Sequence, residues 1–125
     1  MMVKMVIGLA SNTEDAPEQM RKAMEWIKDT FNSCKFSEVY ITDAERGATG
    51  NYHNAVAIAY TSLSCEETVR LFKEYEINAG RTPDMKPLHI VPIDLDLVIC
   101  DRTVLRPADM ASEYFMKGYR QLAKF

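Results

Sequence analysis

The order of strand-like and helix-like apolar patterns limits this chain to few folds. Apolar runs of strand character lie at residues 4–11, 35–42, 52–62 and 91–99, and helical spacing lies at about 15–31, 64–80 and 108 to near the end. Ser64 and Glu67 have capping-box spacing at the start of the second helix, and residues 43–51 predict a loop. The resulting order is β-α-β-β-α-β-α, with two β-α-β crossovers that we expect to be right-handed. This order predicts an α+β protein, a ferredoxin-like βαββαβ sandwich whose helices pack on one face of the sheet, with an added C-terminal helix.

Length and charge narrow the classes of function. The chain has 125 residues, enough for one domain over 1–125 with a real core. Its formal net charge of -3 argues against a sequence-independent grip on nucleic acid. No apolar run approaches the ~20 residues that span a bilayer, so we expect no membrane contact. We expect a cytoplasmic protein that is a monomer or weak homodimer.

The three cysteines, Cys34, Cys65 and Cys100, are an odd number without CxxC spacing. A disulfide framework or a zinc site normally shows paired spacing. We therefore expect three reduced thiols, which agrees with a cytoplasmic location.

The last strand pattern carries two charges. Apolar residues fill every second position of "VPIDLDLVI", namely Val91, Ile93, Leu95, Leu97 and Ile99. Asp94 and Asp96 then share the opposite face, roughly 6–7 Å apart along the strand. Because adjacent carboxylates repel in a low dielectric, a divalent cation is the commonest way to stabilise them. Mg²⁺ suits oxygen ligands and also binds substrate phosphates. The alternative is a strand whose outer face is simply solvated.

A second group of candidates begins the third strand, in "YHNA". Tyr52 and Asn54 point to the same side, with His53 opposite. A tyrosine ring offers a stacking face, and an asparagine offers both a donor and an acceptor. The pair suits a flat, hydrogen-bonding heterocycle. Alternatively, Tyr52 is a core aromatic and Asn54 a turn residue.

Taken in order, these segments resemble the 6-hydroxymethyl-7,8-dihydropterin pyrophosphokinase family of the folate pathway. The resemblance runs through "IGLASN", "PEQMRKAMEWI", the stretch from "SEVYIT" through "NYHNAVAIAYTSLS" to "LFKEYEINAGR", and "IDLDLVI". It covers most of the chain and implies the same ferredoxin-like sandwich. It also implies Mg²⁺-dependent transfer of pyrophosphate from ATP, the co-substrate, to a pterin.

The resemblance assigns roles to the acidic strand and the helix before it. Asp94 and Asp96 would hold two Mg²⁺ ions that bridge the ATP phosphates to the pterin hydroxymethyl group. Arg81 would be a catalytic arginine beside them, or alternatively a residue that only ends the helix.

The resemblance also assigns a pterin site. Thr42 would lie at the pterin edge through its backbone, with Tyr52 beside the ring. Asn54 would form hydrogen bonds to the ring. Phe115 is similar to a pterin-stacking phenylalanine of the family, once a one-residue gap is introduced.

The chain departs from the family where the nucleotide would bind. The family reads tryptophan-glycine-proline-arginine ahead of its aspartates, where this chain has residues 88–91, "LHIV", so that Val91 replaces an arginine. A second arginine is replaced by Pro83 and a late arginine by Glu113, and a late histidine has no counterpart. These changes remove charge-assisted contacts to phosphate.

Three basic residues are candidates to compensate: Lys86, Arg102 and Arg106. We expect Lys86 and Arg102 to bind the ATP co-substrate, although each could instead be a solvated surface residue. The losses leave two alternatives open. One is an impaired or inactive homologue that binds a pterin or nucleotide, and the other is a transferase that uses another phosphate donor or heterocycle.

Overall fold

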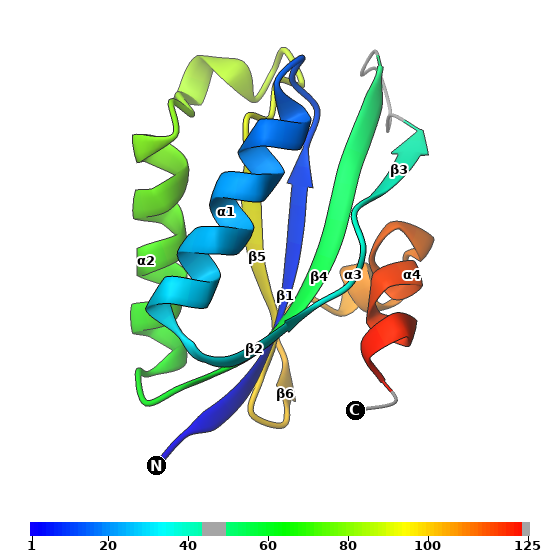
Figure 1. The fold of residues 1–125 in the computed structure, drawn as a ribbon. Helices are drawn as coiled ribbons and strands as arrows, with labels where there is room; N and C mark the ends of the chain where they lie inside the picture. The colour runs from blue at the N-terminus through cyan, green and yellow to red at the C-terminus, as the bar shows by residue number, and fades with distance from the viewer. Residues whose placement is uncertain (44–49, 124–125) are drawn as a thin grey trace.

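The computed structural model describes residues 1–43 and 50–123 (Figure 1). The strands are β1 (Val3–Ser11), β2 (Asn32–Phe36), β3 (Tyr40–Asp43), β4 (Asn51–Thr61), β5 (Asp94–Cys100) and β6 (Thr103–Val104). The helices are α1 (Ala16–Thr30), α2 (Cys65–Asn78), the 3-10 turn η1 (Pro83–Met85), α3 (Pro107–Met110) and α4 (Glu113–Leu122). Most of the loop expected at 43–51 lies outside the described residues.

The strands form one antiparallel sheet in the order β2-β4-β1-β5-β6, and β3 pairs with the other end of β4. The central pair β1 and β4 runs in register from Val3 opposite Thr61 to Ser11 opposite His53. This arrangement confirms the predicted ferredoxin-like α+β fold with its C-terminal helix. In the described residues, no helix is long and apolar enough to cross a membrane.

Helices cover both faces of the sheet, which corrects the expectation of helices on one face. α1 and α2 lie on one side of the sheet, whereas α3 and α4 lie on the other (Figure 1). Met20 and Phe72 belong to the larger core cluster beneath the first pair. Phe115 and Val56 belong to a separate cluster beneath α4. The sheet therefore has two cores, and the C-terminal segment completes the second one.

The strand expected at 35–42 is two strands. Ser37 stands between β2 and β3, and its hydroxyl accepts a hydrogen bond from the Val56 amide at 2.8 Å. A side chain thus takes the place of a backbone carbonyl in the ladder. β2 pairs with the second half of β4 and β3 with the first half, so the chain leaves and rejoins the same partner.

A β-bulge changes the faces at the end of β5. Leu97 pairs with Ile7 and Ile99 pairs with Val6, so that Val98 has no opposite residue. Strict alternation had predicted Ile99 on the same face as Leu97. Ile99 instead lies against the second core. The bulge comes after the two aspartates, which keep their common side.

The predicted C-terminal helix is divided into α3 and α4 at residues 111–112. The Ser112 hydroxyl donates to the Ala108 carbonyl at 2.8 Å and closes the first of the two helices. α4 then approaches the sheet closely at Gly118, where an added Cβ would lie 2.7 Å from Val56 Cγ2. The Tyr40 hydroxyl also accepts the Gly118 amide at 3.1 Å and donates to the Tyr114 carbonyl at 2.5 Å. These contacts fix the start of α4.

The expectation of three reduced cysteines is wrong for two of them. Cys65 and Cys100 form a disulfide, and Cys34 is free. Cys65 begins α2 and Cys100 ends β5, so the pairing depends on how the helix docks beside the strand. Sequence spacing carries no sign of it, because the two residues are separated by 35 positions.

Candidate active site

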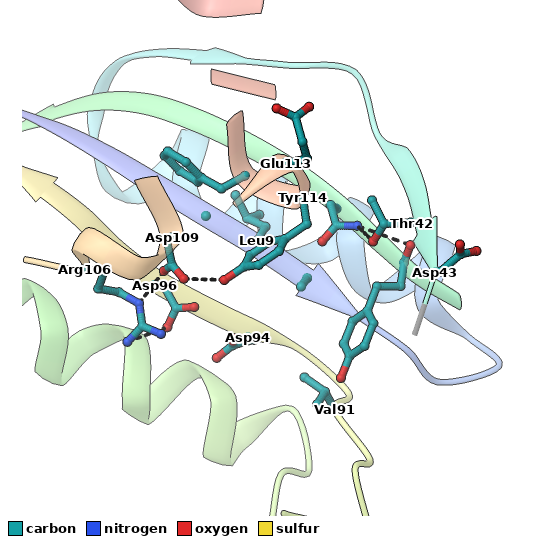
Figure 2. A pocket seen from close by; sticks show the side chains of 16 residues that line it. Leu9, Thr42, Asp43, Val91, Asp94, Asp96, Arg106, Asp109, Glu113 and Tyr114 are labelled. Carbon is teal, nitrogen blue, oxygen red and sulfur yellow. Dashed lines mark hydrogen bonds and ion pairs between the residues drawn. The ribbon is translucent and has the colours of Figure 1, made fainter. Parts of the chain in front are cut away.

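Two cavities meet at the aspartates of β5. The first has a volume of about 350 Å³ and lies between the sheet and the start of α4 (Figure 2). The second, of about 570 Å³, lies between α2, the loop after it and β5. Asp94, Asp96 and Arg106 line both cavities. The predicted common side of the two carboxylates is therefore confirmed, although β5 begins at Asp94 rather than at residue 91.

The outer edge of β5 is open where the aspartates lie, because β6 pairs only with its last residues. Glu76 of α2 satisfies this edge by accepting the Leu95 amide at 2.8 Å. Arg81 Nη1 lies 3.2 Å from Glu76 Oε1 and 3.0 Å from Asp94 Oδ1. One guanidinium thus joins the end of α2 to the acidic strand.

The end of α2 places this arginine. Gly80 has φ +101°, a left-handed conformation that favours glycine after a helix. The Gly80 amide donates to the Ile77 carbonyl and the Arg81 amide to the Glu76 carbonyl. The same backbone turn therefore reverses the chain and directs Arg81 toward β5. The other end of α2 has the predicted capping box between Ser64 and Glu67.

The crowded carboxylates are hard to ionise together. Burial, and then the neighbouring Asp94, raise the pKa of Asp96 to about 8. Burial also raises the pKa of Glu76 to about 7, with a further contribution from Asp94 that Arg81 opposes. Arg106 lies 3.7 Å from Asp96 Oδ1 and opposes the rise there. The strand therefore presents a site that added positive charge would stabilise.

The two carboxylates of β5 could ligate Mg²⁺, but only as part of its coordination shell. Within residues 1–43 and 50–123, no group of three or more His, Cys, Asp or Glu side chains could hold a metal ion. Asp94 and Asp96 offer two carboxylates on one rigid strand. Mg²⁺ is typically bound by one or two carboxylates and completes its shell with water and substrate phosphates. The pair fits a magnesium ion that arrives with a phosphate ligand.

The first cavity brings together the four residues expected to bind a pterin: Thr42, Tyr52, Asn54 and Phe115. Asn54 Nδ2 donates to the Thr42 hydroxyl at 2.7 Å and to the Tyr52 carbonyl at 3.3 Å. These bonds fix the amide between β4 and its partner β3. The Thr42 side chain thus holds Asn54, and the contact of its backbone with a pterin stays a prediction.

Phe115 and its neighbour Tyr114 both contribute aromatic rings to the first cavity, in different positions. Phe115 is only 2% exposed and stacks on Tyr119 with ring centroids 5.6 Å apart. Its ring therefore forms the floor of the cavity. Tyr114 crosses the cavity between Asp109 and the Thr42 side (Figure 2). Tyr114 has no signal in the sequence, because only the docking of α4 turns it inward.

A buried carboxylate connects the two cavities. Asp109 of α3 is 4% exposed and accepts a hydrogen bond from the Tyr114 hydroxyl. Its other oxygen accepts Arg106 Nε at 2.5 Å (Figure 2). Asp109 thus holds one residue of each cavity. The only sequence signal for it is the Arg106–Asp109 spacing of three.

Asn12 holds the loop that leads to Val91 beside the first cavity. Its side chain donates to the His89 carbonyl at 2.6 Å and accepts the Val91 amide at 2.7 Å. The Asn12 amide also donates to the Val91 carbonyl at 2.9 Å. The loop that replaces the family's tryptophan and arginine is thus tied to the end of β1, and Val91 lines the cavity.

The two basic residues expected to bind the nucleotide lie in different places. Lys86 lines the second cavity, together with Lys73, Arg81 and Arg106. Arg102 is exposed in the turn after β5 and lines neither described cavity.

Glu76 was not among the residues predicted for the site, although the sequence carries a signal for its burial. It is the charged member of a buried row with Thr68 and Phe72, at spacings of four.

A family model described as 7,8-dihydro-6-hydroxymethylpterin-pyrophosphokinase matches residues 6–124. The matched range contains both cavities and the residues that line them. No curated protein matches the chain.

Proposed function

The chain belongs to the 7,8-dihydro-6-hydroxymethylpterin-pyrophosphokinase family, and we propose that it transfers the pyrophosphoryl group of ATP to 6-hydroxymethyl-7,8-dihydropterin in a Mg²⁺-dependent reaction. The hydroxymethyl oxygen attacks the β-phosphorus of ATP, and the bond from that phosphorus to the α–β bridging oxygen breaks. AMP leaves, and the hydroxyl proton passes to solvent. The products are AMP and the pterin diphosphate.

One observation carries this proposal: two cavities of different chemistry share Asp94 and Asp96. The first has aromatic residues and the fixed Asn54 amide, which suit a flat heterocycle. The second has four basic side chains, which suit a polyphosphate. A transfer reaction needs its donor and acceptor to meet at the point where charge develops. The shared aspartates mark that point.

The chain's own residues have separable roles in such a reaction. Asn54, held by Thr42, would orient the pterin ring through its amide. Arg81 would keep Asp94 in place and offer its remaining N–H groups to phosphate. Mg²⁺, when bound at Asp94 and Asp96, would neutralise the phosphate oxygens as charge shifts during transfer.

The proposal is tested by mixing the protein with Mg²⁺, ATP and 6-hydroxymethyl-7,8-dihydropterin. AMP and pterin diphosphate should form in equal amounts. A family enzyme run beside it serves as the positive control. Formation of ADP instead of AMP, or of neither product, would contradict the proposal.

A second function is favoured by one specific feature: hydrophobic Val91 and Pro83 replace two arginines. The chain would then bind a pterin without efficient turnover. Calorimetry separates the two functions, since the enzyme should bind both the pterin and Mg²⁺ with an unreactive ATP analogue. Pterin binding without nucleotide binding would favour the non-catalytic function. A thermal-shift screen of other nucleotides and pterins would reveal a transferase with different substrates.

A further inference from the structure

We propose that Arg106 serves two partners in turn: it pairs with Asp96 in the absence of metal and contacts a nucleotide phosphate when Mg²⁺ is bound. The inference rests on the proposed function and adds a phosphate-binding residue to it. Arg106 would restore, from a different segment, part of the positive charge that Val91 and Pro83 do not supply.

The backbone brings Arg106 back to the acidic strand. After β6, the Leu105 and Arg106 amides both donate to the Val98 carbonyl, at 2.8 and 3.4 Å. Pro107 then starts α3, and this turn places Asp109 close enough to hold the arginine Nε at 2.5 Å. Arg106 is thus fixed at its backbone and at one nitrogen of its guanidinium.

The remaining nitrogens point into the shared region. Arg106 Nη1 lies 3.7 Å from Asp96 Oδ1, and the side chain is 49% exposed (Figure 2). This distance is longer than that of a direct hydrogen bond, so the contact is a charge pairing that another cation can replace. A planar guanidinium held at Nε still has a pair of N–H groups for phosphate oxygens. Asp109 is accordingly a positioning residue.

Charge balance predicts effects of opposite sign. A cation next to Asp96 repels an incoming metal ion, so removing Arg106 should strengthen the binding of metal alone. The same removal takes away a charge-assisted contact to phosphate and should weaken binding of the metal–nucleotide complex. A substitution that merely loosens the fold would weaken both.

The test compares Arg106→Gln and Arg106→Lys with the wild type. Arg70→Gln is the matched control, since that exposed arginine of α2 lines neither described cavity. One titration measures Mn²⁺ binding without nucleotide by electron paramagnetic resonance. The other measures calorimetric binding of the α,β-methylene analogue of ATP at saturating Mg²⁺. Circular dichroism confirms that each variant is folded.

We expect Arg106→Gln to bind Mn²⁺ alone several-fold more tightly and the nucleotide analogue roughly ten-fold more weakly. Arg106→Lys keeps the charge but loses the paired N–H donors of the guanidinium. Its Mn²⁺ affinity should therefore stay within about two-fold of the wild type, while it still binds the analogue more weakly than the wild type does. Losses of both affinities in Arg106→Gln, or nucleotide binding equal to that of Arg70→Gln, would overturn the inference and leave the proposed function standing. A wild-type chain that binds neither Mg²⁺–nucleotide nor pterin would instead overturn the proposed function, and this inference with it.

Discussion

Arg81 Nη1 lies 3.0 Å from Asp94 Oδ1, and it is the same nitrogen that approaches Glu76. The guanidinium therefore neutralises two carboxylates from different elements. In Arg81→Gln, both would lose their shared cation, so we expect a loss of about 1–2 kcal/mol in the free energy of unfolding near pH 8. Urea unfolding measures it, with Arg70→Gln on the exposed side of α2 as the control. Equal stability of the two variants would show that the bridge contributes nothing.

A Gly118→Ala variant tests the close packing of α4 against the sheet. In Gly118→Ala, the new Cβ would lie 2.7 Å from Val56 Cγ2 and 2.8 Å from the Tyr40 hydroxyl, so the helix must shift. We expect a loss of about 1–3 kcal/mol in unfolding free energy. Pterin affinity should also fall, since Tyr114 and Phe115 move with the helix. Tyr40→Phe removes only the hydroxyl and should have a smaller effect on both. Unchanged pterin affinity in Gly118→Ala would contradict the role given to α4.

The disulfide between Cys65 and Cys100 predicts how the thiols react. Alkylation of the denatured protein without reductant, read by mass spectrometry, should label Cys34 alone, and labelling after reduction should reach all three. Because the bond closes a span of 35 positions, its reduction should lower the unfolding free energy by roughly 3–4 kcal/mol in the chain-entropy treatment. Cys34→Ser controls for loss of a thiol. Three labels before reduction would show that the pair is not joined.

Asp96 should make stability depend on pH. Burial raises the pKa of Asp96 from 3.8 to about 8. Between those values the folded chain holds a proton that the unfolded chain has released, so stability falls as pH rises from about 4 toward 8. Asp96→Asn removes this dependence, and its stability relative to the wild type should increase between pH 5 and pH 8. Urea unfolding in metal-free buffer tests this, with exposed Asp29→Asn as the control. A constant difference between Asp96→Asn and wild type would contradict the raised pKa.

Local patterns in the sequence predicted much of this molecule. The alternation in 91–99 placed Asp94 and Asp96 on one side, because side chains in a strand alternate whatever packs around them. The spacing of Ser64 and Glu67 likewise predicted the start of α2, because a capping box is local chemistry.

Features that depend on tertiary contacts were missed. Val98 forms a bulge only against β1, which moved Ile99 to the other core. Cys65 meets Cys100 only after α2 docks. Asp109 joins Arg106 to Tyr114 only once α3 and α4 pack over the sheet. The bulge and the disulfide have no spacing that the sequence alone would reveal, and the Arg106–Asp109 spacing of three gives no sign of Tyr114.

The most direct measurement is AMP formation from ATP and 6-hydroxymethyl-7,8-dihydropterin by the wild type, Asp96→Asn and Asp101→Asn at saturating Mg²⁺. Asp101 follows β5 immediately and is exposed in the turn, so its variant makes the same chemical change outside both described cavities. We expect pterin-dependent AMP from the wild type and Asp101→Asn, and a loss of at least about 100-fold in Asp96→Asn. An Asp96→Asn rate equal to that of Asp101→Asn, or no pterin-dependent AMP from the wild type, would contradict transfer at the shared aspartates.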